Sequence, residues 1–241
     1  GWEQACFFEL EKTLGAHKHE LFAFILEPLI QGAAGMLLYP AGYLKKAREL
    51  CDKYNILLIV DEVATGFGRT GRMFACEHEN ITPDIMCLAK GITGGYLPLA
   101  ATLTTQKIYD AFLGEYEEYK TFFHGHTYTG NPLGCSAAIA NLDIFEKENT
   151  IDKLQDKINF LTEKLKEFET IDCVCEIRQK GFMVGIELLS GKNIKNVIKK
   201  ARQNGVIIRP LGNVIVLMPP LSISIKELGI LLNTVRKSII F

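Results

Sequence analysis

The stretch "LLIVDEVATGFGRTG", residues 57–71, joins an apolar run to a glycine-rich turn and is the most informative segment for the fold. The run ends at Asp61-Glu62. An apolar run that ends in polar residues is typical of a strand that is buried on both faces and ends at the edge of a parallel sheet. The glycines that follow have the spacing G-x-G-x-x-G: Gly66, Gly68 and Gly71. Three chemistries fit this pattern: a magnesium-binding strand of a nucleotide hydrolase, a dinucleotide-binding turn, and a strand-end aspartate that holds another cofactor.

The surrounding sequence predicts further buried strands. Four apolar runs have the length of strands: residues 23–30, 56–61, 85–89 and 99–105. A helix with a clean apolar face is predicted over 40–54, and another begins at Asn131-Pro132, where Asn caps the helix and Pro takes its first position. Unbroken apolar strands that alternate with helices predict an α/β fold with a parallel sheet covered on both faces.

The pattern changes after a helix predicted at 151–168. Short strands and helices then alternate: strands at 172–178, 182–188, 206–209 and 213–217, and helices at 193–204 and from Ser224 onward. The last helix starts with the capping box Ser-Ile-Lys-Glu. We therefore expect two units, residues 1–150 and a smaller α+β unit of residues 151–241.

Composition excludes several classes of protein. The 241 residues are 48% hydrophobic and carry a net charge of −1 without a basic block, which argues against a nucleic-acid-binding surface. The longest apolar runs are too short to span a bilayer, so no membrane association is expected. Seven scattered cysteines lack zinc-ligand spacing and predict reduced thiols in a cytosolic protein.

The first two chemistries fit poorly. A nucleotide hydrolase needs the phosphate-binding pattern G-x-x-x-x-G-K-[ST], which is absent from these residues, so that interpretation is weakened. A dinucleotide site needs its glycines directly after the strand, whereas residues 61–65 intervene here. The segment after Gly71 is also too short and broken for a full crossover helix. These glycines are better explained by a loop that needs positive φ angles or close packing.

The third chemistry rests on Asp61 and Lys90. Each residue ends an apolar strand, so both are expected at the same edge of the sheet, where ligands bind in such folds. A carboxylate and an amine at that edge suit pyridoxal 5′-phosphate (PLP). The lysine forms a Schiff base with the cofactor aldehyde, and the carboxylate keeps the ring nitrogen protonated. On spacing alone, a solvated lysine and a capping aspartate remain alternatives.

Four blocks in order resemble the class III aminotransferases of the fold-type-I PLP family: "ILEPLIQG", "LLIVDEVATGFGRTG", "CLAKGITGGYLPLA" and "HGHTYTGNPLGCSAA". The resemblance covers nearly the whole chain. It implies that residues 1–150 are the later portion of the PLP-binding large domain, a mostly parallel sheet with helices on both faces. Residues 151–241 would then be the small C-terminal α+β domain.

The resemblance also implies roles around the cofactor. Lys90 matches the Schiff-base lysine, which also shuttles a proton, and Asp61 matches the partner of the pyridine nitrogen. Val63 matches the apolar group packed against the ring, and Glu27 in the "EP" block lies close to the cofactor in the family. Thr127 matches the threonine that binds the cofactor phosphate from the other subunit of a dimer.

Substrate contacts follow in the same way. Gly125 and His126 match residues that line the substrate pocket, and Arg209 matches the arginine that pairs with the carboxylate of the keto acid. The blocks "ITGGYLPLA" and "FFHGHTYTGNPLGC" favour members that transfer an amino group from S-adenosylmethionine to 8-amino-7-oxononanoate in biotin biosynthesis. Members that use ornithine or 4-aminobutyrate are the alternative within the family. The implied assembly is a homodimer with shared active sites.

One departure from the family concerns the start of the chain. Family members carry a long N-terminal part before the block that reads "GWEQACFFELE" here, so the resemblance implies the C-terminal half of such an enzyme. Two expectations stay open. Either a separate N-terminal half completes the enzyme, or this chain is a non-catalytic fragment or partner subunit.

Overall fold

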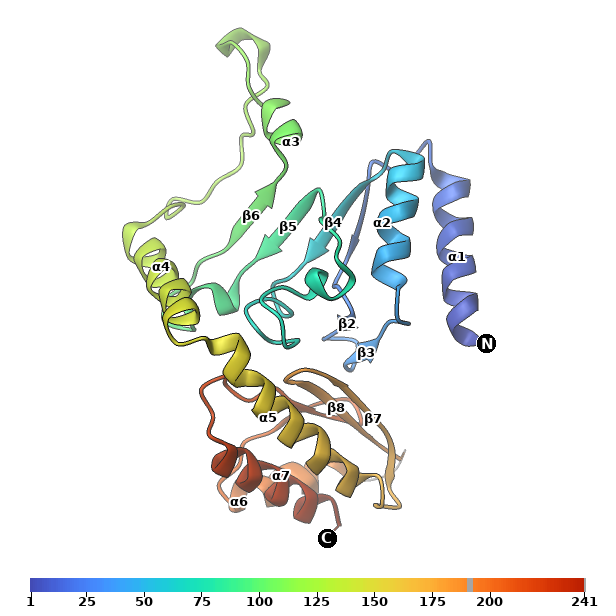
Figure 1. Cartoon of the computed structure of the whole chain (residues 1–241), viewed down its shortest axis with the longest axis vertical. Coiled ribbons are helices and arrows are strands. Elements are labelled where there is room, and N and C mark those ends of the chain that lie inside the picture. The colour runs from blue at the N-terminus through green and yellow to red at the C-terminus, as the bar shows by residue number, and fades with distance from the viewer. Residues whose placement is uncertain (190–192, 241) are drawn as a thin grey trace. The chain divides into compact units, whose positions relative to one another are not determined.

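The computed structural model describes residues 1–189 and 193–240, which form two units (Figure 1). The first unit contains three segments: Gly1–Pro28, Pro40–Phe67 and Cys76–Glu148. The second contains Leu29–Tyr39, Gly68–Ala75 and the chain from Asn149 onward. The expectation of two contiguous units did not include the two short early segments, which cluster with residues far along the sequence. No helix in the described part of the chain is both long enough and apolar enough to cross a membrane.

The first unit is built on a four-stranded sheet in the order β1-β4-β5-β6. Its strands are β1 (Ala23–Leu26), β4 (Leu57–Asp61), β5 (Ile85–Leu88) and β6 (Ala101–Thr104). The first three are parallel, as predicted, but β6 runs antiparallel to β5 and pairs Ala101 with Leu88. The reason is the connection: it holds only the 3₁₀ turn η2 (Lys90–Thr93), whereas a parallel return needs a crossover, usually a helix.

The predicted strand over 23–30 is two elements. Strand β1 ends at Leu26, and Leu29 adopts a left-handed φ of 66°, which breaks the extended run. Strand β2 (Ile30–Gln31) then pairs antiparallel with β3 (Leu37–Leu38) in the second unit. The prediction of one continuous strand was therefore wrong at its C-terminal end, and the break leaves Glu27 directly after β1.

The helices of the first unit are α1 (Trp2–His17), α2 (Tyr43–Tyr54), α3 (Gln106–Asp110) and α4 (Pro132–Lys147). Helix α2 packs on β4, and α1 packs on α2 (Figure 1). The carboxylate of Glu79, at the end of the 3₁₀ turn η1 (Ala75–Glu79), accepts hydrogen bonds from the amides of Gly42 and Lys45 at 2.8 and 2.7 Å. It thereby caps the N-terminus of α2 from a distant segment. The predicted Asn131 cap of α4 is confirmed, since its Oδ1 accepts from the amide of Gly134 at 2.7 Å.

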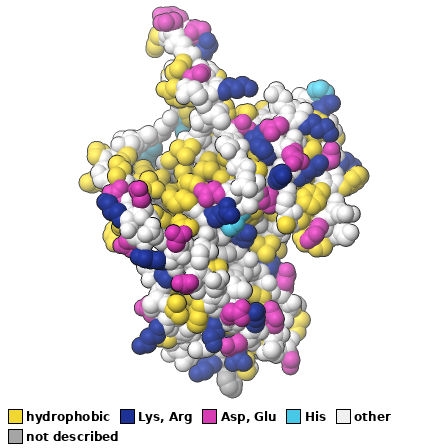
Figure 2. Space-filling view, in the orientation of Figure 1, with side chains coloured by type: hydrophobic (Ala, Val, Ile, Leu, Met, Phe, Trp, Pro, Cys, Tyr) yellow, Lys and Arg dark blue, Asp and Glu magenta, His cyan; other side chains and the backbone are white. Residues whose placement is uncertain are grey.

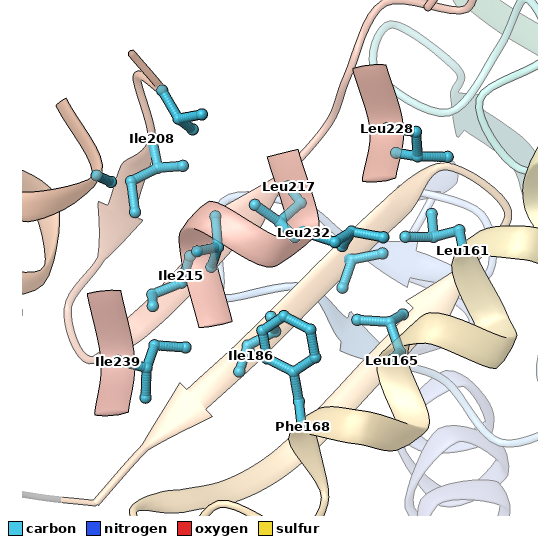
Figure 3. Packing of buried hydrophobic residues seen from close by; sticks show 14 of the residues in the cluster. Leu161, Leu165, Phe168, Ile186, Ile208, Ile215, Leu217, Leu228, Leu232 and Ile239 are labelled. Carbon is cyan, nitrogen blue, oxygen red and sulfur yellow. The ribbon is translucent and has the colours of Figure 1, made fainter. Parts of the chain in front are cut away.

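The second unit has an antiparallel sheet in the order β7-β8-β10-β9. Its elements are α5 (Thr150–Leu165), η4 (Lys166–Phe168), β7 (Val174–Lys180), β8 (Met183–Leu188), α6 (Ile194–Gln203), β9 (Arg209–Leu211), β10 (Val214–Leu217) and α7 (Ile225–Ile240). Helix and strand residues interlock in one core, which includes Leu161, Phe168, Ile186, Ile215 and Leu232 (Figure 3). The capping box of α7 is confirmed, because Ser224 and Glu227 exchange hydrogen bonds.

The glycine-rich segment is a loop, as predicted. Gly68 and Gly71 have φ angles of 85° and 96°, which favour glycine. The loop is held within the second unit: the carbonyl of Arg69 accepts from the amide of Phe182 at 2.8 Å. The guanidinium of Arg69 donates to the carbonyl of Pro219. Burial lowers the pKa of Arg69. The sequence G-x-G-x-x-G therefore serves chain packing here.

Gly181 is expected to be the least replaceable glycine of this packing. A Cβ at Gly181 would lie 2.4 Å from the carbonyl carbon of Thr70, and its φ is 59°. Gly205 offers a matched control, because its φ is 81° but a Cβ added there would have no neighbour within 4 Å. We expect Gly205→Ala to cost about 1 kcal/mol of unfolding free energy and Gly181→Ala about 3 kcal/mol, since only the latter adds a backbone clash. Urea unfolding measures both, and equal costs would contradict the packing argument.

Candidate active site

Three polar residues follow three neighbouring parallel strands. Glu27 comes after β1, Asp61 ends β4 and Lys90 follows β5 by two residues. The strands are in register, with Leu26 opposite Val60 and Asp61 opposite Cys87. Because the strands are parallel, their carboxyl ends meet at one edge of the sheet, which is the ligand-binding edge in open α/β folds. The edge predicted from the sequence is therefore formed.

The carboxylate of Asp61 has spare capacity to accept hydrogen bonds. Its Oδ1 accepts from the amide of Val63 at 3.0 Å, and the side chain is half-buried. Across residues 1–189 and 193–240, no cation pairs with this carboxylate and no donor reaches its Oδ2. Burial raises the pKa of the neighbouring Cys87 thiol, and the negative charge of Asp61 adds to that shift. Asp61 is thus a fixed carboxylate with one oxygen available to a ring N–H.

Lys90 occupies an unusual backbone position. It opens η2 with a φ of 45°, in the left-handed region that lysine rarely adopts. Its side chain is exposed, and within the described chain its amine has neither a hydrogen bond nor an ion pair. A strained backbone of this kind clusters at functional sites and costs roughly 1–2 kcal/mol. The strand end therefore presents a primary amine with no hydrogen bond or ion pair to any described residue.

Gly125, His126 and Thr127 lie in an exposed segment between α3 and α4. The segment is ordered by its own hydrogen bonds: the amide of Tyr128 donates to Nδ1 of His126 at 3.1 Å, and the amide of His126 donates to Oγ1 of Thr129 at 2.8 Å. Among the described residues, no hydrogen bond joins this segment to Asp61 or Lys90. Among the described residues of a single chain, Thr127 is therefore not hydrogen-bonded to Asp61 or Lys90.

Arg209 belongs to the second unit. It opens β9 opposite Val216 of β10, and its side chain is exposed. Exposure alternates along this segment, so Arg209 shares a face with Ile207, which is 82% exposed. A guanidinium in this setting can receive a carboxylate through two parallel hydrogen bonds.

Sequence reasoning missed the role of Glu62. Its side chain is completely buried: one oxygen accepts from Oγ1 of Thr65 at 2.6 Å, and the other from the amide of Cys76 at 2.9 Å. Burial raises the pKa of the Cys76 thiol to about 12, and the charge of Glu62 adds to this effect. Glu62 thereby ties both ends of the loop that follows Asp61. No periodic signal marks this role, because its partner Cys76 is fourteen residues away.

Comparisons with known proteins agree with this geometry. A family model described as aminotransferase class-III matches residues 1–239. The adenosylmethionine-8-amino-7-oxononanoate aminotransferase of Geobacter sulfurreducens is 53% identical over 245 residues, covering 97% of this chain and 54% of the relative. The enzyme of the same name from Aquifex aeolicus is 54% identical over 242 residues, covering 96% of this chain and 53% of the relative.

Solved structures match equally well. The crystal structure of the adenosylmethionine-8-amino-7-oxononanoate aminotransferase from Methanocaldococcus jannaschii gives a TM-score of 0.94 at 47% identity, covering 97% of this chain and 57% of that one. A PLP-bound amine transaminase from an uncultivated Pseudomonas species gives 0.90 at 38% identity, covering 98% and 56%. The chain spans about half the length of the curated relatives it matches. With a family model that extends over almost all of its residues, the chain belongs to the class-III aminotransferases.

Proposed function

We propose that this chain carries the lysine and the ring-binding aspartate of a PLP-dependent aminotransferase. The reaction would transfer an amino group from S-adenosylmethionine to 8-amino-7-oxononanoate, in biotin biosynthesis. The observation that carries the proposal is the placement of Asp61 and Lys90 at the ends of adjacent parallel strands. The names of the relatives support the choice of acceptor. All seven cysteines are unpaired, which supports a reducing, cytoplasmic compartment.

The residues at the strand ends fit the cofactor. When bound, PLP supplies an electron sink that stabilises negative charge on the substrate carbon. The exposed amine of Lys90 would hold the cofactor through its aldehyde carbon and then move a proton at the same nitrogen. The available oxygen of Asp61 would accept a hydrogen bond from the protonated ring nitrogen. Val63 would line the ring, and Glu27 would lie beside it at the end of β1.

A homodimer is part of the proposal. Residues 112–128 expose aromatic side chains, among them Tyr116 at 81% and Phe123 at 78%. Hydrophobic side chains also gather over β5 and β6 on the visible surface (Figure 2), and Leu103 of β6 is 51% exposed. Apolar surface of this extent is typical of interfaces. In such a dimer, Thr127 would bind the cofactor phosphate of the other subunit, with Gly125 and His126 beside the substrate.

Arg209 is the proposed partner of the substrate carboxylate. We expect Arg209→Ala to raise KM for the keto acid about 10- to 100-fold, because a charge-assisted hydrogen-bonded pair contributes about 1.5–3 kcal/mol. KM for the amino donor is expected to rise less, because Arg209 is proposed to pair with the carboxylate of the acceptor. Steady-state kinetics with each substrate varied in turn measures the effect. Arg202→Ala, at an exposed position of α6, is the control. Equal increases in both KM values would contradict the assignment.

The direct test of the proposed function is covalent trapping. The chain is mixed with PLP, reduced with borohydride and digested, and phosphopyridoxyl groups are located by mass spectrometry. Selective labelling of Lys90 is expected, whereas labelling spread evenly over exposed lysines would refute the assignment. Activity is then assayed for the chain alone and after mixing with the portion of the Geobacter sulfurreducens relative that this chain does not match. Activity that appears on mixing distinguishes a catalytic chain from a non-catalytic partner.

A further inference from the structure

The turn that carries Lys90 is held from two sides by residues with no assigned role. Helix α4 packs against η2, and the loop after β4 packs against it as well. Both supports belong to the first unit. This matters because Lys90 itself has a left-handed φ of 45°, and its exposed side chain has no hydrogen bond or ion pair with residues 1–189 and 193–240. The backbone around Lys90 must therefore be held by its neighbours.

Asn141, in the middle of α4, provides the polar support. Its Nδ2 donates to the carbonyl of Gly91 at 2.9 Å and to the carbonyl of Ile92 at 3.2 Å. Its Oδ1 lies 3.0 Å from where a Cβ on Gly94 would stand. One amide group thus spans the residues that directly follow Lys90. These carbonyls lie in a single 3₁₀ turn, where hydrogen-bond geometry is poorer than in an α-helix.

Phe67 provides the apolar support from the glycine-rich loop. A Cβ on Gly91 would stand 2.8 Å from the Cβ of Phe67, so only glycine fits at that position. Phe67 is 3% exposed, has a φ of 56°, and its ring lies 6.5 Å from the ring of Phe145 on α4. The loop, the lysine turn and α4 therefore form one packed unit around the backbone of Gly91.

We propose that Asn141 is a positioning residue that fixes the Lys90 backbone in the conformation from which its amine reaches the cofactor. The inference rests on the proposed role of Lys90. Because the N-cap of α4 is Asn131, four residues after Thr127, the same helix also links the lysine turn to the proposed phosphate-binding segment. Asn141 would act only through the backbone and would touch neither cofactor nor substrate.

The experiment measures how fast PLP labels Lys90 in three variants. Asn141→Ala removes both hydrogen bonds and favours the helix, while Asn141→Asp keeps the shape but places an acceptor against two carbonyl oxygens. Asp143→Asn, which only alters an exposed ion pair with Lys147 on α4, is the matched control. The rate is followed by borohydride trapping at fixed times, with the other lysines in the digest as internal references.

We expect the Lys90 labelling rate to fall about tenfold in Asn141→Ala and further in Asn141→Asp, since each lost hydrogen bond accounts for a few-fold to about tenfold. The reference lysines and Asp143→Asn should be unchanged. If the substitution instead unfolded the protein, labelling would rise at all lysines and the melting temperature would fall. That combined result would overturn the positioning role. Selective Lys90 labelling at the parent rate in both Asn141 variants would overturn this inference alone. Absence of selective Lys90 labelling in the parent would remove the proposed function as well.

Discussion

Lys90→Ala is expected to abolish covalent retention of PLP and to lower transamination by about 10⁴-fold, the upper range for loss of a positioned proton-transfer group. The physical reason is that, in the proposed function, the lysine amine would have two tasks at the strand end. It would hold the cofactor covalently, and its nitrogen would accept and return a proton. The amine has no hydrogen bond or ion pair within the described chain, so its removal should leave the fold intact. The visible absorbance of the PLP-loaded protein and steady-state rates measure the two losses.

Two controls define this result. Lys107→Ala on α3 removes a lysine that has no proposed role and should retain the absorbance and the rate of the parent. Added methylamine should restore part of the activity of Lys90→Ala, because a small free amine can take over proton transfer. If Lys90→Ala binds PLP with the same absorbance and turns over as the parent does, the assignment of the lysine is wrong.

Asp61→Asn is expected to lower the rate of transamination by about 10²- to 10³-fold, the range for loss of one preorganised electrostatic contact. Asparagine retains the shape of the side chain and can still accept from the amide of Val63. It carries no negative charge, so it would not favour a protonated ring nitrogen and would support the electron-sink chemistry of PLP less well. Single-turnover kinetics with the amino donor measures the effect on the chemical step.

The trapping experiment separates this effect from a loss of binding. At saturating PLP, Lys90 should still be labelled in Asp61→Asn, because the lysine does not depend on the charge of Asp61. Asp110→Asn on α3, which only accepts a hydrogen bond from Gln106, is the matched control and should behave as the parent does. An Asp61→Asn protein with an unchanged single-turnover rate would contradict the proposed role of the carboxylate.

Local signals in the sequence account for the parts of the fold that were predicted correctly. The strand that ends at Asp61 was visible as an unbroken apolar run, and the caps at Asn131 and Ser224 depend only on residues within one turn. Helix α1 was missed because its apolar residues form no continuous stripe: Trp2 and Phe8 are 62% and 65% exposed. The direction of β6 was also missed, because an apolar run has the same pattern in either direction.

The unpredicted parts of the site depend on contacts between distant residues. Asn141 reaches the carbonyl of Gly91 across fifty positions, and its place on α4 looks like that of any half-buried polar residue. No sequence pattern assigned a structural role to Glu62, but the loop folds back and encloses it. The roles of such residues depend on which segments meet after folding. Secondary-structure propensity and hydrophobic periodicity therefore do not predict them.

Segments 29–39 and 68–75 belong to the same unit as the residues after 148. The chain therefore crosses from one unit to the other at five peptide bonds. A truncated protein that starts at Asn149 would lack Ile30 and Met36, whose side chains cover Met183, and it would lack the Arg69 loop that bonds to Phe182. Such a truncation would expose part of its core and aggregate. During synthesis, these two early segments likewise lack their packing partners until the residues after 148 have been made. The two early segments can therefore complete their packing only after residues beyond 148 have been synthesised.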